Sequence, residues 1–323
     1  MAISSIKNKT SGRKLLVGNA VWYIAEGRNL SRGVFGGGYN GTNSRVIDYI
    51  TITSTGNATS FGNLNANGKG YHGSGSSTTR GLFMGGDGTG GAQASTDYIT
   101  IATTGDSSNF GDVTVTRGRN SGTSNNTRAL NVGGTVGSTR SNVIDYYTIA
   151  TTGAATDFGD LTAARYNPGA AASPTRAIIA GGFDLNAIDY VEIATTGNAV
   201  TFGSLTAYRY ALAGCSSNTR ALFGGGDTTG GGSYSNIIDY YTIATTGTAT
   251  DFGDLTIARR YVASTSNSIR GVWGGGTHSS DSTREVTIDY VTIASIGNAT
   301  DFGDLTSPGR YPAAACSSAH GGI

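Results

Sequence analysis

Few side chains in this sequence are of a type and spacing that could carry catalysis or hold a metal ion. The three histidines, His72, His278 and His320, lie in different parts of the chain, whereas zinc needs three or four convergent His, Cys or Asp ligands. Cys215 and Cys316 occupy equivalent positions in two copies of a repeat, so we expect small core residues rather than a disulfide. No Ser-His-Asp set can be assembled. We therefore predict no metal, no cofactor, no catalytic residue and no enzymatic activity.

Aspartate and arginine are the reactive types that do recur at a regular spacing. The dipeptide Asp-Tyr occurs at Asp48, Asp97, Asp145, Asp189, Asp239 and Asp289, and an arginine precedes a short run of small residues at Arg117, Arg165, Arg209, Arg260 and Arg310. An active site is needed once, whereas these residues are repeated. We therefore predict an ion pair or backbone cap inside each repeat, because buried polar groups need partners. A ring of these arginines that attracts an acidic polysaccharide is the alternative.

The elements that position these residues follow from the repeat itself. Successive Asp-Tyr pairs are 49, 48, 44, 50 and 50 residues apart, and the phenylalanine of a Phe-Gly pair follows each aspartate by 13 residues. Each copy contains four short runs of β-branched, aromatic or small residues separated by Gly- and Asn-rich turns. Six copies of a four-stranded unit predict an all-β, six-bladed β-propeller. The segment 310–319 repeats the innermost strand and is predicted to close the ring in the first blade.

The repeat also resembles a known family. Gly181-Gly182, Tyr190 and Phe202 stand at the places of the glycine doublet and the two aromatics of the kelch pattern, with Phe where that family usually has Trp. Arg165, Arg209, Arg260 and Arg310 resemble the Pro-Arg of the same family. The resemblance spans residues 32–318 and implies a propeller. It does not carry a function with it, because one fold hosts many functions.

Residues 1–31 lie outside the repeat. They hold three of the four lysines of the chain and a single acidic residue, and the composition changes abruptly where they end. We predict two parts, an N-terminal anchoring arm at 1–31 and the propeller at 32–323. The residues expected to anchor the arm on a partner are Lys7, Lys9, Arg13, Lys14 and Trp22. A tail folded back onto the propeller is the alternative.

The loops between the second and third strands are where the copies differ most. Variable loops on a rigid scaffold are where recognition usually resides. The side chains best suited to meet a sugar or a peptide there are Tyr39, Asn40, Asp227, Tyr234, His278 and Asp281. The alternative is that these loops are solvated and merely tolerate change.

Composition limits the class of function. Glycine supplies 52 of 323 residues, charged residues only 13%, against roughly 25% in ordinary proteins, and the net charge is +1. Such a balance gives no footprint for nucleic acid or an anionic membrane. The N-terminal charges are not followed by the apolar run of a secretion signal, and no stretch is apolar enough for a membrane helix.

The glycine-rich blades, the opening MAISSIKNKTSG and the missing signal together resemble kelch-like virion proteins of tailed phages, especially cyanophages. That resemblance implies a virion protein released by lysis, whose arm binds other virion proteins. We expect a tail-fibre or adhesin component that recognises a host-surface polysaccharide or protein, with homo-oligomers on the particle allowed. A head or tail decoration protein is the first alternative. A cellular kelch-type interaction scaffold is the second, and the shortage of Lys and Glu argues against it.

Overall fold

The computed structural model describes residues 31–65, 68–228, 233–278, 283–306, 309–311 and 313–323, together with the backbone of two strands nearer the N-terminus. The chain divides into two compact units, Met1–Leu30 and Ser31–Ile323. In the first unit β1 (Lys14–Val17) pairs antiparallel with β2 (Ala20–Tyr23) as a hairpin. In the described parts of the chain every regular element is a strand, and no helix is long and apolar enough to cross a membrane.

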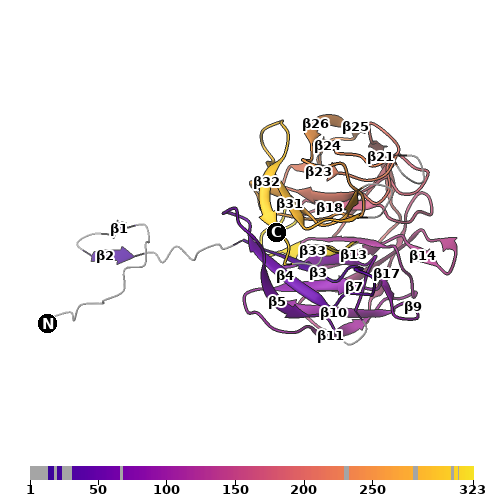
Figure 1. Cartoon of the computed structure of the whole chain (residues 1–323), viewed down its shortest axis with the longest axis horizontal. Helices are drawn as coiled ribbons and strands as arrows, with labels where there is room; N and C mark the ends of the chain where they lie inside the picture. Colours follow the sequence, from indigo (N-terminus) through magenta and orange to yellow (C-terminus); the bar gives the residue numbers. More distant parts are fainter. Residues whose placement is uncertain are drawn as a thin grey trace. The chain divides into compact units, whose positions relative to one another are not determined.

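The second unit is a six-bladed β-propeller, as predicted (Figure 1). Each blade is an antiparallel sheet of four main strands, and in the second to sixth blades these run from the axis outwards in chain order. The inner strands are β33 (Ala314–Ser317), β6 (Gly73–Ser76), β12 (Ser121–Ser124), β18 (Gly169–Ala172), β22 (Ala213–Ser216) and β27 (Ala263–Ser266). The second strands are β3 (Arg32–Gly36), β7 (Arg80–Met84), β13 (Arg128–Val132), β19 (Arg176–Ala180), β23 (Arg220–Gly224) and β28 (Arg270–Gly274).

The third strands carry the Asp-Tyr pairs, and the outer strands carry the Phe-Gly pairs. The third strands are β4 (Val46–Thr51), β10 (Ser95–Thr100), β16 (Val143–Thr148), β20 (Ala187–Glu192), β24 (Ile237–Thr242) and β31 (Thr287–Thr292). The outer strands are β5 (Thr59–Asn63), β11 (Ser108–Asp112), β17 (Thr156–Asp160), β21 (Val200–Ser204), β26 (Thr250–Asp254) and β32 (Thr300–Asp304).

Small additions decorate this plan. Three loops between second and third strands form small hairpins whose strands have two residues each. These are β8 (Asp87–Gly88) with β9 (Gly91–Ala92), β14 (Thr135–Val136) with β15 (Thr139–Arg140), and β29 (Thr277–His278) with β30 (Thr283–Arg284). In addition β25 (Gly247–Thr248) pairs in parallel with β21 of the neighbouring blade.

The C-terminal strand closes the ring, which confirms the prediction made for 310–319. In the first blade β33 pairs with β3 in a register that places Ala314 opposite Gly36 and Ser317 opposite Gly33. The first blade is therefore built from both ends of the propeller sequence. No other arrangement would cover the inner edge of β3, because an exposed strand edge leaves backbone groups unpaired.

Apolar side chains fill the space between neighbouring blades. One cluster joins Leu130, Ile144 and Phe158 of the third blade to Ile179 and Val191 of the fourth, and five further clusters occupy the other interfaces. The periodicity of the strands accounts for this, because alternate residues of a strand point to opposite faces of its sheet. Both faces of each blade are covered by a neighbour, so the ring forms one continuous core.

The first residue of each second strand fastens the outside of each interface. The Arg128 guanidinium lies 4.5 Å from the centre of the Tyr146 ring in its own blade and donates to the carbonyl of Ile193 in the next blade at 2.9 Å. The same pair of contacts recurs at Arg32, Arg80, Arg176, Arg220 and Arg270. These arginines therefore hold the scaffold together and are not available to a ligand.

Candidate functional site

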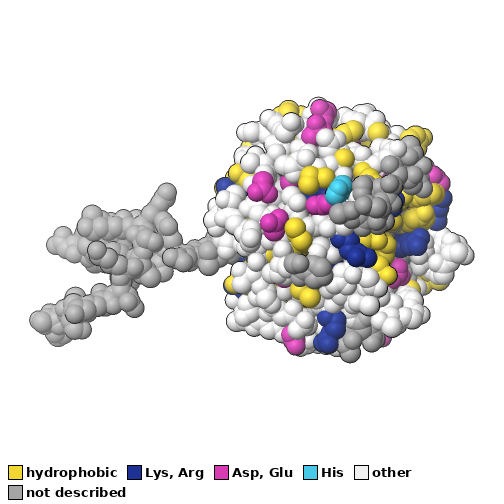
Figure 2. Space-filling model, in the orientation of Figure 1, with side chains coloured by type: hydrophobic (Ala, Val, Ile, Leu, Met, Phe, Trp, Pro, Cys, Tyr) yellow, Lys and Arg dark blue, Asp and Glu magenta, His cyan; other side chains and the backbone are white. Residues whose placement is uncertain are grey.

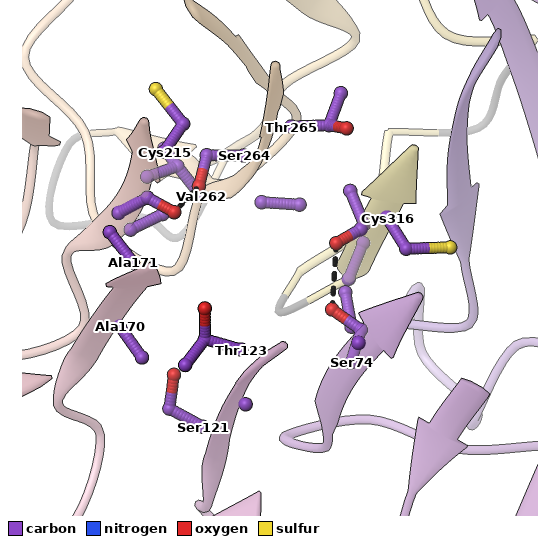
Figure 3. Close-up of a pocket in the computed structure, with 18 of the residues that line it drawn as sticks. Ser74, Ser121, Thr123, Ala170, Ala171, Cys215, Val262, Ser264, Thr265 and Cys316 are labelled. Carbon is purple, nitrogen blue, oxygen red and sulfur yellow. Dashed lines mark hydrogen bonds between the residues drawn. The ribbon is translucent and has the colours of Figure 1, made fainter. Parts of the chain in front are cut away.

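A narrow channel of about 120 Å³ lies among the six inner strands, lined mainly by Gly, Ala, Ser, Thr and Cys (Figure 3). Hydroxyl groups in this lining bond the strands to one another. Ser74 Oγ donates to the carbonyl of Ala315 at 2.7 Å, and Ser266 Oγ donates to the carbonyl of Ser216 at 2.8 Å. The free thiols Cys215 and Cys316 are buried, and burial raises the pKa of Cys316 to about 12. The lining is therefore suited to structure more than to chemistry.

The C-terminal residues close the channel where the inner strands end. His320 Nε2 lies 3.0 Å from the carbonyl of Ser76 and 3.1 Å from Ser124 Oγ, while its Nδ1 accepts from the backbone N–H of Gly322 at 3.0 Å. The ring is therefore neutral with its proton on Nε2, and burial lowers the pKa of His320 to about 4.

The opposite end, where the inner strands begin, is surrounded by a closed circuit of aromatic and arginine side chains that we call the mouth ring. Its members are Tyr71, Arg119, Tyr166, Phe183, Tyr210, Arg260 and Tyr261. They come from the second to the sixth blade. On the side of the molecule where β14 lies, hydrophobic side chains gather among those of Lys and Arg (Figure 2).

Aromatic rings make up one half of the mouth ring. Tyr261 stands edge-on to Tyr71 with 5.3 Å between ring centres, and it stacks on Tyr311 of the first blade at 5.7 Å. The Arg119 guanidinium lies 5.9 Å from the centre of the Tyr71 ring and 5.5 Å from that of Tyr166. These distances are within reach of cation–π attraction. Arg119 therefore joins two aromatic clusters.

The other half of the ring ends in an ion pair. Tyr166 stacks on Phe183 at 5.1 Å, and Phe183 meets the edge of Tyr210 at the same distance. Arg260 Nη1 donates to the Tyr210 hydroxyl at 3.1 Å, and the same guanidinium forms a 2.7 Å ion pair with the buried Asp227. Burial, then the charge of Asp227, raises the pKa of Tyr210 to about 12.

Backbone conformation marks the same part of the molecule. Five non-glycine residues hold φ between +51° and +57° at one repeated position, two residues after a buried basic residue: Tyr71, Arg119, Asn167, Ala211 and Tyr261. A left-handed conformation costs a residue with a side chain roughly 1–2 kcal/mol, and glycine adopts it freely. In a chain with 52 glycines, none of these positions is glycine. Three of the five side chains belong to the mouth ring.

Beneath the mouth, each blade contains a buried ion pair, which confirms the predicted arginine–aspartate pairs. The pairs are Arg117–Asp145 at 2.8 Å, Arg165–Asp189 at 2.9 Å, Arg209–Asp239 at 2.6 Å, Arg259–Asp289 at 2.7 Å, Arg310–Asp48 at 2.7 Å and Lys69–Asp97 at 3.5 Å. The preceding blade adds a hydroxyl, as where Thr206 Oγ1 donates to Asp239 Oδ1 at 2.7 Å. These carboxylates are engaged by the scaffold.

One member of the predicted arginine set was wrong. Arg259, not Arg260, forms the buried pair of the sixth blade, and Arg260 turns to the mouth. The prediction chose Arg260 because the dipeptide Arg260-Tyr261 has the same sequence as Arg209-Tyr210, in which the arginine is the buried one. Counting four residues back from each inner strand finds the correct residue, and it also finds Lys69 in the second blade.

The residues predicted for binding are partly gathered at this mouth. Tyr39 meets the edge of Tyr311 at 6.2 Å, and the Tyr234 ring lies 5.0 Å from the Arg260 guanidinium, which also pairs with Asp227. The other three predicted residues do not join the mouth ring. Asn40 turns back on its own loop and accepts from Thr42, His278 pairs with Glu285, and Asp281 lies outside the described residues.

The predicted anchoring residues belong to the first unit. Lys7, Lys9 and Arg13 lie outside the described residues, and the structure gives only the backbone of Lys14 and Trp22, in β1 and β2. The sequence interpretation missed Tyr71, Arg119, Tyr166, Phe183, Tyr210 and Tyr261. Their signal is positional, since all but Phe183 lie one or two residues after the buried basic residue and are bulky in a segment that otherwise favours small residues.

No protein-family model matches the chain, and no curated protein matches it either.

Proposed function

We propose that this protein is a non-enzymatic recognition protein whose propeller binds a ligand at the mouth ring. The observation that carries the proposal is the contrast within the repeat. Positions that hold the blades together recur in every copy, whereas the neighbouring positions differ from blade to blade and assemble a ring of five aromatic and two arginine side chains. Aromatic residues and arginine are the types most enriched at energetically important contact sites.

The resemblance to phage virion proteins gives this recognition a setting. In that setting the chain is a tail-fibre or adhesin component, its N-terminal unit is held by other virion proteins, and its propeller meets the host surface. The separation of residues 1–30 from the propeller as a compact unit supports a division of labour between attachment and recognition. A kelch-type ancestry of the blades fits the positions of the glycine pairs, which adopt left-handed φ at Gly181 and Gly182.

Binding of purified protein to host cells tests the proposal. The full chain, fluorescently labelled, is expected to bind cells of a susceptible host, and Tyr166→Ala combined with Tyr210→Ala is expected to abolish that binding. A variant of the opposite face, Ile269→Thr, serves as the control, because Ile269 is exposed there and the other five blades have serine or threonine at that point. Equal loss in both variants would contradict a site at the mouth.

Gold-labelled antibody against the propeller, viewed on particles by electron microscopy, tests the setting. Label at the distal end of the tail is expected for an adhesin. Label over the head or collar would instead favour a decoration protein. A particle fraction without label would remove the virion interpretation and leave a recognition propeller of cellular origin.

A further inference from the structure

The two arginines of the mouth ring have similar surroundings but a different charge balance. Both lie against tyrosine rings, Arg260 at 5.1 Å from the centre of Tyr261 and Arg119 at 5.5 Å from that of Tyr166. Arg260 is neutralised by the buried carboxylate of Asp227 at 2.7 Å. Arg119 is exposed, and no carboxylate among the described residues lies within ion-pair distance of it.

The nearest acidic side chain does not fill this role. Asp87 is half-buried and lies against Gly118. Burial raises the pKa of Asp87, and the charge of Arg119 offsets only part of that rise. A carboxylate from outside the protein would therefore meet Arg119 with its donors available. Arginine is the side chain best shaped for such a group, because its planar fork donates two parallel hydrogen bonds.

Backbone strain shows that the Arg119 side chain is held there against a preference for glycine. Its φ is +56°, in the left-handed region that costs a side chain-bearing residue roughly 1–2 kcal/mol. The side chain is exposed and forms no hydrogen bond within the described residues that would repay this strain. Strained backbone of this kind is concentrated at ligand-binding and active sites.

The surface that continues from Arg119 is aromatic and leads to a cavity. The half-buried Tyr166 and Phe183 stack at 5.1 Å between ring centres, and the buried Tyr210 supports Phe183 at the same distance. Beyond them lies a cavity of about 360 Å³. It is lined by Gly182, Asp184, Tyr208, Arg209, Tyr210, Asp227 and Thr228. The Tyr208 ring there is 57% exposed. Flat aromatic faces of this kind stack against the C–H faces of sugar rings, while the acidic and hydroxyl side chains suit sugar hydroxyls.

We infer that the mouth binds an acidic oligosaccharide, with the carboxylate of one sugar on Arg119 and its neighbouring sugars along Tyr166, Phe183 and Tyr208. This inference rests on the proposed recognition function and names its ligand class. The occupied path crosses the third, fourth and fifth blades. It leaves the ion pair of Arg260 with Asp227 intact.

Calorimetry on the full chain tests the inference with a glucuronate-containing oligosaccharide and the same oligosaccharide after reduction of its carboxylates. The acidic form is expected to bind about tenfold to a hundredfold more tightly, the range that charge-assisted hydrogen bonds contribute. Arg119→Gln should bring the acidic form down to the affinity of the reduced form and leave the reduced form unaffected. Arg119 is exposed, so this variant should fold, which circular dichroism would check.

Arg284→Gln is the matched control. Arg284 is also exposed and lies beside mouth tyrosines, 5.7 Å from the centre of the Tyr39 ring, but on the other side of the channel. It should leave the affinity unchanged, and an equal loss in both variants would overturn the assignment to Arg119. Equal binding of acidic and reduced forms, or binding to host cells without binding to either, would overturn the ligand class and leave the recognition function standing. Binding to neither sugar nor cells would remove both.

Discussion

Two positions in each blade lie only two residues apart, yet one holds the same type of residue in all blades and the other varies from blade to blade. The first holds the buried basic residue that pairs with the Asp of the third strand, and it is arginine in five blades and lysine in one. The second faces the mouth and is different in almost every blade, reading Tyr71, Arg119, Asn167, Ala211 and Tyr261 where the structure describes it. Uniform residues hold the ring together, and varied residues build the mouth ring, which occurs once.

The comparison explains why the mouth can change without loss of the fold. A buried ion pair is destabilised strongly when one partner is removed, because the other charge is left without compensation. The residue two positions later has no ion-pair partner among the described residues, and the rigid strands on either side tolerate its strained conformation. The scaffold therefore carries the stability, and the mouth carries the difference between one copy and another.

The largest effect is expected from removing the strand that closes the ring. Deletion of residues 306–323 removes β33, which leaves the inner edge of β3 unpaired. It also takes Ala314 and Cys316 out of one blade interface and Ala313 and Ala315 out of another. We expect loss of the cooperative unfolding transition and rapid proteolysis. Deletion of residues 320–323 alone is the control, since it keeps β33 and should retain the transition.

A smaller but still large effect is expected at the uniform position. Asp239→Ala leaves the fully buried Arg209 without its carboxylate and Thr206 without its acceptor. The free energy of unfolding should fall by about 3–5 kcal/mol in denaturant titrations. Asp184→Ala breaks an exposed ion pair with Arg140 and should cost less than about 1 kcal/mol. Similar losses in the two variants would remove the distinction between scaffold and surface pairs.

An intermediate effect is expected from acid at the closed end of the channel. The pKa of His320 is about 4 in the folded protein and about 6.5 in the unfolded chain, so the unfolded chain binds the proton more readily between these values. Its contribution to stability is complete above pH 6.5 and is lost as the pH falls toward 4, by roughly 1.4 kcal/mol for each pH unit of the difference. Thermal unfolding of the His320→Gln variant should show a shallower loss over this range. Parallel curves for the two proteins would contradict a neutral, buried His320.

Much of the fold could be predicted from the sequence because it is repeated. The spacing of Asp48 and its five equivalents predicted the number of blades. The additional copy of the inner strand at the C-terminal end predicted that this strand closes the ring in the first blade. The mouth could not be derived in the same way, because its residues do not repeat. Arg260 shows the reason: a tyrosine placed next to it imitated the neighbouring repeat, and only the distance to the inner strand separates the buried Arg259 from the mouth residue.

The smallest effect is also the sharpest test of the comparison, because its sign differs from the usual one. Arg119→Gly relieves a side chain held at φ +56°, so we expect the unfolding free energy to rise by up to about 1 kcal/mol while affinity for the acidic oligosaccharide is lost. Arg140→Gly is the matched control, an exposed arginine without left-handed φ, where glycine should lower stability by about 0.5–1 kcal/mol. A glycine that lowers stability equally at both positions would show that Arg119 is not strained. Arginine at position 119 would then cost no folding free energy, and its left-handed φ would no longer support a bound ligand.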